Sequence, residues 1–109
     1  MRFIFLAYDH TDPGALDRRL AVRQEHLKEA VPDKRNGFII EGGAILDNHT
    51  VSITTPDSKK MIGSSMLIEA ESEQAAWDRL RRDIYCTGNV WNMEKATLIP
   101  VINGFGDVK

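Results

Sequence analysis

The stretch MIGSSMLIEAESEQAAWDRLRRDIY, residues 61–85, decides how the rest of the chain can fold. Residues 64–70 form a short apolar run, which predicts a β-strand. Ser72 follows where a helix N-cap belongs, because its hydroxyl can accept a hydrogen bond from the first helical turn. Trp77 and Leu80 then recur at helical spacing on one apolar face. The stretch therefore predicts a strand that runs directly into a helix ending near residue 85.

Asp83 is the unusual residue of this predicted helix. Together with Ala76 and Leu80 it falls at positions i, i+4 and i+7, so the three side chains share the apolar face. A carboxylate at the core edge of a helix's last turn is unfavourable, because it loses water and meets the negative end of the helix dipole. We therefore expect a partner for Asp83 elsewhere in the chain.

The remaining sequence predicts one further helix and three further strands. The strands are Arg2–Tyr8, Gly37–Leu46, interrupted by Gly42-Gly43, and Lys95–Ile102. The polar segment 47–60 is interpreted as a long turn with room for a short strand at Val51–Thr54. The helix begins at Asp12-Pro13, a capping side chain followed by proline, and ends between Pro32 and Gly37. Its apolar stripe is Leu16, Leu20, Leu27 and Val31, with Arg19, Arg23 and His26 beside it.

The predicted order β-α-β-β-α-β defines an α+β, ferredoxin-like fold, a four-stranded antiparallel sheet with two helices on one face. The other face of the sheet is then open. The first strand is apolar on both of its faces, with Phe3, Phe5 and Ala7 on one and Ile4, Leu6 and Tyr8 on the other. We therefore expect a second subunit to cover the open face, giving a homodimer packed sheet to sheet.

Composition limits the classes of function. A chain of 109 residues, 42% hydrophobic and 28% charged, is typical of one globular domain, here residues 1–109 with a loose tail from about residue 103. The net charge of −2 argues against nucleic-acid binding. We expect no membrane contact, because no apolar run approaches the roughly 20 residues of a membrane span. The first residues do not form a secretory signal and Cys86 is the only cysteine, so we expect a reducing, cytoplasmic location.

His26 is the natural partner for Asp83, since in this fold the two helices pack side by side. A carboxylate bonded to one imidazole nitrogen fixes the tautomer and raises the basicity of the other nitrogen, as a general base requires. The alternative is a structural role, in which a backbone carbonyl satisfies His26 and Asp83 caps the loop after its helix.

Several motifs in their order along the chain resemble the YCII-related (YciI-like) proteins of the dimeric α+β barrel group. They are Arg23-x-x-His26, Gly43-Ala44-Ile45-Leu46, Gly63-Ser64-Ser65, Glu69-Ala70-Glu71-Ser72 and Asp83-Ile84-Tyr85. The resemblance implies a ferredoxin-like protomer, a dimer that closes two sheets against each other, and a cleft in each subunit. It also implies an active-site His–Asp pair at His26 and Asp83. The prolines of the family's Gly-Pro-Leu and Asp-Pro-Phe motifs are missing here, and Tyr85 takes the aromatic position.

Four further residues are candidates for binding a substrate. Arg23, one turn before His26, can hold a carboxylate or phenolate with two hydrogen bonds, or it can be an ordinary solvated arginine. Ser65 and Ser64 are polar residues in an apolar strand, so one of the two hydroxyls can face the cleft, although such a serine more often bonds neighbouring backbone. Tyr8 can line the mouth of the cleft or simply pack, and Tyr85 can supply an aromatic wall.

No metal or other cofactor is expected. The histidines His10, His26 and His49 and the single Cys86 lack the spacing of a zinc site. The glycine pairs lack the strand-to-helix context of a phosphate loop.

Two classes of function follow. The first is a small-molecule enzyme in which His26, oriented by Asp83, moves a proton on an aromatic, lactone or carbonyl compound in an isomerase or lyase (elimination) reaction. The second is a non-catalytic dimeric module that binds a metabolite or has a structural role. A haem-degrading monooxygenase, known among other dimeric α+β barrels, is a weaker third hypothesis, because nothing distinguishes a proximal haem ligand from His26.

Overall fold

The computed structural model describes residues 1–48 and 60–104, and the predicted strand at Val51–Thr54 and the end of the predicted tail lie outside them. In the described part of the chain the elements are β1 (Arg2–Tyr8), α1 (Ala15–Arg35), β2 (Ile39–Leu46), β3 (Met61–Glu69), α2 (Glu73–Arg81), α3 (Ile84–Thr87) and β4 (Thr97–Val101). The strands fall within two or three residues of their predicted bounds.

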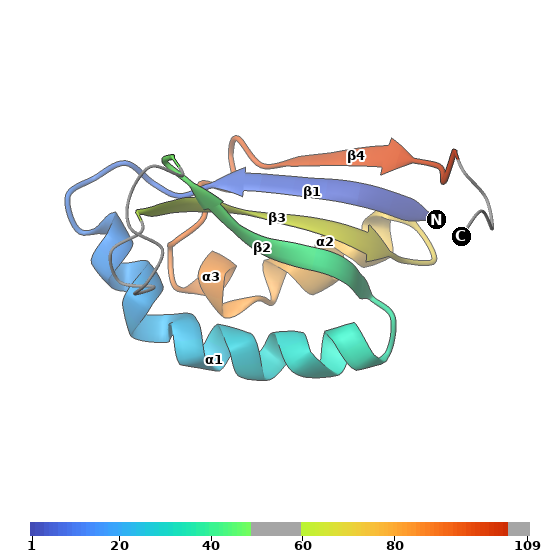
Figure 1. Ribbon diagram of the computed structural model, residues 1–109, viewed down its shortest axis with the longest axis horizontal. Coiled ribbons are helices and arrows are strands. Elements are labelled where there is room, and N and C mark those ends of the chain that lie inside the picture. The colour runs from blue at the N-terminus through green and yellow to red at the C-terminus, as the bar shows by residue number, and fades with distance from the viewer. Residues whose placement is uncertain (49–59, 105–109) are drawn as a thin grey trace.

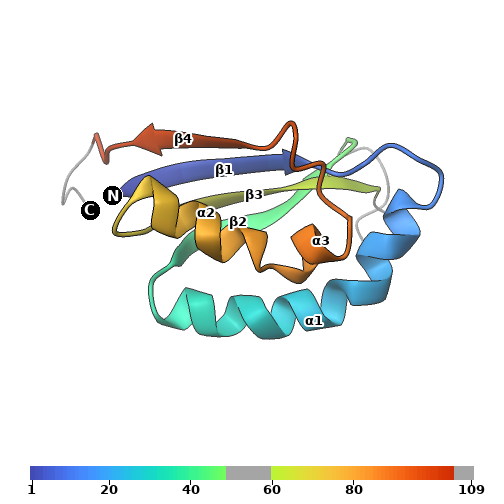
Figure 2. The same ribbon diagram turned by 180° about the vertical axis from the view of Figure 1, so that it is seen from behind.

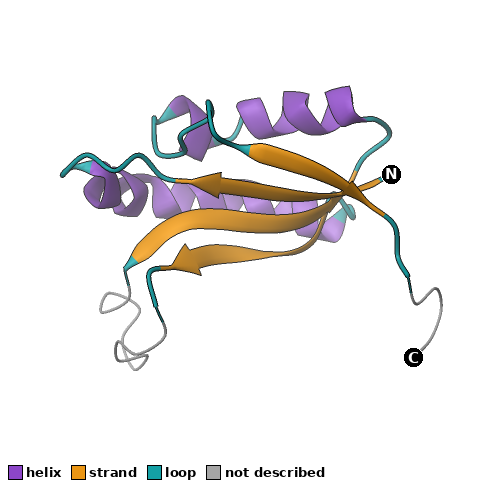
Figure 3. Cartoon of the chain, turned by 90° about the horizontal axis from the view of Figure 1, so that it is seen from above, coloured by secondary structure: helices purple, strands orange, loops and turns teal. Residues whose placement is uncertain are grey.

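The four strands form one antiparallel sheet in the order β2-β3-β1-β4. Figure 3 shows the strands side by side, and Figures 1 and 2 show that α1, α2 and α3 all lie against the same face of the sheet. Helix α1 runs beneath β2 and β3, and α2 runs beneath the other half. This confirms the predicted α+β, ferredoxin-like fold.

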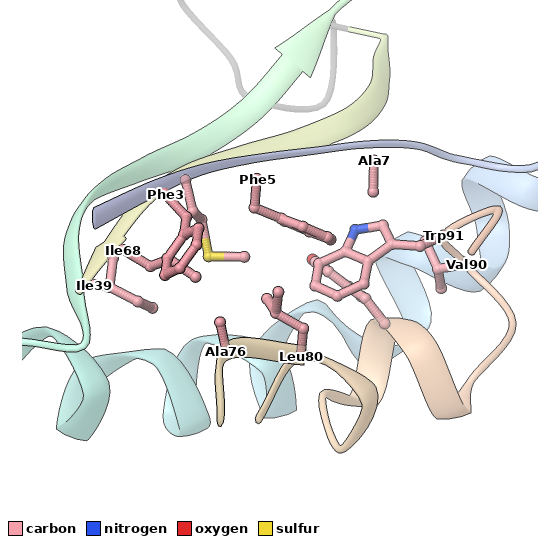
Figure 4. Packing of buried hydrophobic residues seen from close by; sticks show 11 residues of the cluster. Phe3, Phe5, Ala7, Ile39, Ile68, Ala76, Leu80, Val90 and Trp91 are labelled. Carbon is pink, nitrogen blue, oxygen red and sulfur yellow. The ribbon is translucent and has the colours of Figure 1, made fainter. Parts of the chain in front are cut away.

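The core lies between the sheet and the helices. Phe3, Phe5 and Ala7 alternate along β1 and are buried on the helix side, as predicted from the period of two in a strand. Helix α2 contributes Ala76 and Leu80, which point up at the two phenylalanines (Figure 4). Trp91 closes the far end of this cluster, with its ring centroid 5.0 Å from that of Phe5.

Helix α2 begins as predicted, but it ends earlier. The Ser72 hydroxyl accepts a hydrogen bond from the Ala75 backbone N–H at 3.0 Å and so caps the helix. The helix was expected to continue to Tyr85; instead it ends at Arg81, and Asp83 is the N-cap of the separate short helix α3. The reason is local, because an aspartate side chain can bond a backbone N–H two residues ahead and so competes with continuation of the helix.

Helix α1 differs from its prediction in two ways. Its first helical residue is Ala15, because Asp12 does not cap a helix that starts at residue 13; its carboxylate accepts from the Gly14 backbone N–H and from Arg18. The predicted apolar stripe also fails to face the core, since Leu20, Leu27 and Val31 are 40–48% exposed. Arg19, which is buried, takes the inward position instead.

Strand β3 requires glycine at residue 63. A Cβ atom there would lie 2.6 Å from the Ala7 carbonyl oxygen and 3.1 Å from the Tyr8 Cα, both backbone atoms of the paired strand β1. Gly43 in β2 is a matched control, because a Cβ atom there has no neighbour within 4 Å.

We expect Gly63→Ala to lower the free energy of unfolding by about 1–3 kcal/mol, because the backbone of β1 cannot move aside without breaking the sheet. Gly43→Ala should be neutral or slightly stabilising, since it only reduces the freedom of the unfolded chain. Urea unfolding of both variants measures the difference, and equal stabilities would contradict the close approach of β1 and β3.

Candidate active site

A cleft of about 360 Å³ lies between helix α1 and the strands β2 and β3. Its size is at the lower end of the range for small-molecule sites, about 300–1,000 Å³. The residues that line it are Arg19, Arg23, His26, Leu27, Ala30, Val31, Lys34, Ile39, Glu41, Gly42, Gly43, Ala44, Met61, Ser64, Met66 and Tyr85. The predicted Gly42-Gly43 interruption of β2 lies here, and the irregular register of β2 is between Ile39 and Glu41, just before it.

His26 and Asp83 meet at the inner wall of this cleft. The His26 Nδ1 atom lies 2.8 Å from Asp83 Oδ1, within hydrogen-bond distance. The Asp83 side chain is 4% exposed, and that of His26 is 14% exposed. The predicted contact between the two helices is therefore present, and no backbone carbonyl takes the place of Asp83.

Asp83 satisfies several groups at once. The same Oδ1 atom accepts a hydrogen bond from the Tyr85 backbone N–H at 2.9 Å, as the N-cap of α3. Arg79 Nη1 lies 3.7 Å from Asp83 Oδ2, while the guanidinium of Arg79 is also hydrogen-bonded to Asp33 on α1. Asp83 follows the C-cap of α2 but is also the N-cap of α3, so these contacts offset its position at the end of α2.

The hydrogen bond to Asp83 fixes the tautomer of His26. An ionised carboxylate can only accept hydrogen bonds, so Nδ1 must be the donor. The neutral ring then carries its lone pair on Nε2, the nitrogen available to take a proton. Within residues 1–48 and 60–104, no hydrogen bond is made to Nε2, and His26 lines the cleft.

Tyr85 packs flat against the imidazole of His26. The two ring centroids are 3.9 Å apart with an angle of 14° between the planes, and the guanidinium carbon of Arg19 lies 4.5 Å from the centre of the Tyr85 ring. Burial raises the pKa of the Tyr85 hydroxyl above its usual value of 10.0, although the charges of Arg19 and Arg23 oppose this. Tyr85 is therefore a neutral phenol at neutral pH.

A buried polar network lies beside the dyad, and of its members only Ser64 was considered for the site from the sequence. Arg19 donates to both carboxylate oxygens of Asp9, at 2.7 and 3.2 Å, and to Ser64 Oγ at 2.6 Å. Trp91 Nε1 also donates to Ser64 Oγ, at 2.9 Å. A usable signal was present, since Arg19 lies two turns before His26 on the same side of α1.

The Ser64 hydroxyl is left with a proton to donate. Its two acceptor positions are taken by Arg19 and Trp91. No acceptor for the Ser64 proton is found in the described part of the chain, and Ser64 lines the cleft. The hydroxyl can therefore donate to an oxygen atom of a bound molecule.

The predicted binding residues fall into two groups. Arg23 and Tyr85 line the cleft, and Arg23 makes no hydrogen bond or ion pair with another described residue. Ser65 and Tyr8 do not line it: Ser65 pairs with Leu6 on the face away from the helices, and Tyr8 is 56% exposed at the end of the same face of β1. Side chains alternate along a strand, so Ser64 rather than Ser65 points to the cleft.

The described residues show neither a cluster that could bind a metal nor a reactive thiol. In residues 1–48 and 60–104 there is no group of three or more His, Cys, Asp or Glu side chains placed to hold a metal ion. Burial raises the pKa of the Cys86 thiol, and the nearby Asp83 carboxylate raises it further, so Cys86 is not a thiolate at neutral pH. The described part of the chain also has no helix long and apolar enough to cross a membrane.

The fold and the site define a class of protein, a ferredoxin-like α+β chain with a polar cleft between its first helix and its sheet. Residues 1–95 match the YCII-related domain, and the chain belongs to this family.

Three known proteins illustrate the family relationship. A solved structure, 5-chloro-2-hydroxyhydroquinone dehydrochlorinase (TftG) from Burkholderia phenoliruptrix in complex with 2,5-dihydroxybenzoquinone, is 26% identical, with a TM-score of 0.79 and coverage of 95% of this chain and 96% of that one. Aspercryptin biosynthesis cluster protein B of Emericella nidulans is 29% identical over 83% of this chain, which corresponds to only 56% of that protein. Fusaric acid biosynthesis protein 2 of Gibberella fujikuroi is 27% identical over 81% of this chain and 82% of its own length.

The raised pKa of Tyr85 predicts a loss of stability in alkali. A group that holds its proton more tightly in the folded chain stabilises the fold fully below its unfolded pKa and loses that contribution as pH rises through the folded pKa. The melting temperature should therefore fall as pH rises above about 10. Tyr85→Phe should weaken this fall, whereas Tyr8→Phe, at the exposed tyrosine, should retain it. Thermal melts from about pH 8 to about pH 11 measure the effect, and identical profiles for all three proteins would contradict it.

Proposed function

We propose that this protein is a cofactor-independent lyase or isomerase in which His26 removes a proton from a hydroxylated aromatic, lactone or carbonyl compound. The observation that carries the proposal is the buried Asp83 carboxylate on Nδ1 of His26, which leaves Nε2 as the proton acceptor in a cleft of about 360 Å³. A small-molecule enzyme of this kind agrees with the neighbour, whose name describes removal of chloride from a hydroxylated ring.

The proton transfer uses each part of the dyad. Nε2 takes a proton from a substrate hydroxyl or from a carbon next to a carbonyl group. The imidazolium that forms is stabilised by the Asp83 carboxylate on the opposite side of the ring. A proton taken from a hydroxyl leaves its electron pair on that oxygen, and one taken from carbon leaves a pair that is delocalised onto the carbonyl oxygen. In an isomerisation the imidazolium returns the proton to a different substrate atom. In an elimination the pair forms a new double bond while the leaving group departs with its own bonding electrons, and the imidazolium gives its proton to solvent.

Other residues of the cleft can stabilise the negative charge that develops on the substrate oxygen. Arg23 is a cation without a protein partner among the described residues, and it can hold the substrate oxygen or a carboxylate. The Ser64 hydroxyl can donate to the same substrate, because Arg19 and Trp91 occupy its acceptor positions. Tyr85 keeps the imidazole ring in place by stacking and excludes water from one of its faces.

The second candidate function is a non-catalytic module that binds a small molecule without changing it. One observation favours it: Asp83 caps α3 and lies beside Arg79, so it stabilises the fold whether or not a reaction takes place. In this case the contact with His26 would only join α1 to α3.

The two functions are separated by changing each member of the dyad. We expect His26→Gln to lower kcat about 100- to 10,000-fold, the usual contribution of a general base. Asp83→Asn should remain folded, because asparagine is an equally good N-cap, and should also be slow, because it no longer supplies the charge that stabilises the imidazolium. The assay follows chloride release from 5-chloro-2-hydroxyhydroquinone together with thermal melting.

His10→Gln is the control, since His10 lies in the connection before α1 and does not line the cleft. Turnover that survives His26→Gln undiminished would reject His26 as the catalytic base. A large loss of stability in Asp83→Asn, with normal turnover per folded molecule, would favour the structural role.

We also propose that two copies of the chain pack sheet to sheet. On the face away from the helices, Ile4 of β1 stands opposite Leu67 of β3 and Ile99 of β4, which gives a continuous apolar row across three strands. Ile99 is 43% exposed in the single chain. A self-complementary face of this kind suits a twofold dimer.

Ile99→Glu should dissociate this dimer, because it places a charge in the apolar row. Light scattering during size exclusion should give twice the 12.3 kDa mass of one chain for the original protein and the single mass for the variant. Leu20→Glu, at an exposed leucine on the outer side of α1, should leave the dimer intact. A monomeric original protein would overturn the proposal.

A further inference from the structure

The cleft has two chemically different ends, and this bears on the substrate that the proposed function requires. Along α1, the lining residues are polar in the first half, Arg19, Arg23 and His26, and apolar in the second, Leu27, Ala30 and Val31. Tyr85 and Ser64 join the polar half. We call these the polar end and the apolar limb.

Contacts at both ends fix the direction of the cleft along the sheet. At the polar end, Arg19 bonds Ser64 of β3, which pairs with Ala44 of β2. At the opposite end, Lys34 donates to the carbonyl oxygen of Ile40 near the start of β2. The cleft therefore follows α1 from Arg19 to Lys34.

The cleft is longer along α1 than a single aromatic ring. Lys34 follows Arg19 by 15 positions, and at about 1.5 Å per residue the lined face of α1 is about 22 Å long. The polar groups that could handle a ring, from Arg19 to His26, cover only about half of it. In the other half, the α1 residues that line the cleft before Lys34 are the apolar Leu27, Ala30 and Val31.

The floor of the apolar limb has the same character. It is formed by Ile39 of β2, Met66 of β3 and the backbone of Gly42, which pairs with Met66. A Cβ atom at residue 42 would lie 2.9 Å from Met66 Cγ, so the absence of a side chain there keeps both the strand pairing and the floor. Met61, at the polar end, adds one apolar surface for the face of a ring.

The far end of the apolar limb carries one cation and one carboxylate. Lys34 bonds the Ile40 carbonyl, and its Nζ lies 3.9 Å from Glu41 Oε1, so a cation and a carboxylate lie close together at the exposed exit. Arg23, the cation without such a partner in the described chain, lies instead beside His26.

We infer that the substrate is an amphipathic molecule, with an oxygen-rich ring or enol head between Arg23, His26 and Ser64 and a neutral alkyl or acyl tail along Leu27, Val31 and Met66. The inference rests on the proposed function for the role of the head and adds the tail. A tail also gives binding energy remote from the reacting atoms, which an enzyme can use to orient the head.

The test compares binding of two compounds to the intact protein by calorimetry. One is 2,5-dihydroxybenzoquinone, and the other is the same ring with a linear hexyl chain on one ring carbon. Each methylene buried in an apolar site is worth a factor of about four in affinity. We expect the hexyl compound to bind at least about tenfold more tightly than the bare ring, since part of its chain remains exposed in an open cleft.

Val31→Trp places a large side chain in the limb at an exposed helix position, where folding tolerates it. It should abolish the advantage of the hexyl chain while the bare ring binds as before. Leu20→Trp is the matched control, because Leu20 is a similarly exposed residue of α1 that does not line the cleft. Leu20→Trp should still bind the hexyl compound more tightly than the bare ring.

Equal affinities of the original protein for the two compounds would overturn the inference, and so would an equal loss of both affinities in Val31→Trp. Failure to bind either compound would overturn it as well. None of these three results depends on turnover. A protein that releases chloride through His26 but gains nothing from the hexyl chain would retain the proposed function and lose only the tail.

Discussion

The burial of the Asp83 carboxylate is the constraint on which the helical layer depends. Removing an ionised carboxylate from water costs several kcal/mol unless hydrogen bonds and opposite charges compensate. The compensation comes from the Tyr85 backbone N–H in α3, from His26 in α1 and from Arg79 in α2. One charge therefore links all three helices, and the same hydrogen bond that stabilises the fold orients the imidazole.

A second buried charge explains why helix α1 is turned as it is. Arg19 is nearly inaccessible to water and is held by Asp9 at the end of β1 and by Ser64 of β3. Truncating one partner of such a pair typically costs about 3–5 kcal/mol, so the pair holds the orientation of the helix firmly. With Arg19 inward, the leucines of α1 face outward or along the cleft. The first half of α1 therefore directs polar side chains at the cleft, whereas Leu27, Ala30 and Val31 line it further along.

The sequence predicted the parts of the fold that depend on local patterns. The alternation of β1 and the Ser72 cap are encoded by neighbouring residues, and both are found in the structure. The break at Asp83 was missed although its cause is local, a side-chain cap on the Tyr85 backbone N–H. The orientation of α1 was missed because it depends on buried Arg19 meeting Asp9 and Ser64, which lie far from it along the chain. The contact of His26 with Asp83 could be predicted, since the unusual position of the aspartate indicated it. Ser64 could not be preferred to Ser65, because the face of β3 toward the helices is set by pairing with β1 and β2.

The structural and catalytic interpretations of the dyad share one hydrogen bond. Asp83 needs the Nδ1 proton of His26 to offset its burial, and that requirement alone places the lone pair on Nε2. The lone pair on Nε2 is thus a consequence of how this fold compensates the burial of the Asp83 carboxylate. It would be present even in a protein without activity. What separates an enzyme from a binding module must therefore lie in other groups of the cleft, which the fold does not require. Arg23, an exposed cation without a partner among the described residues, is such a group, because the packing of α1 does not need it.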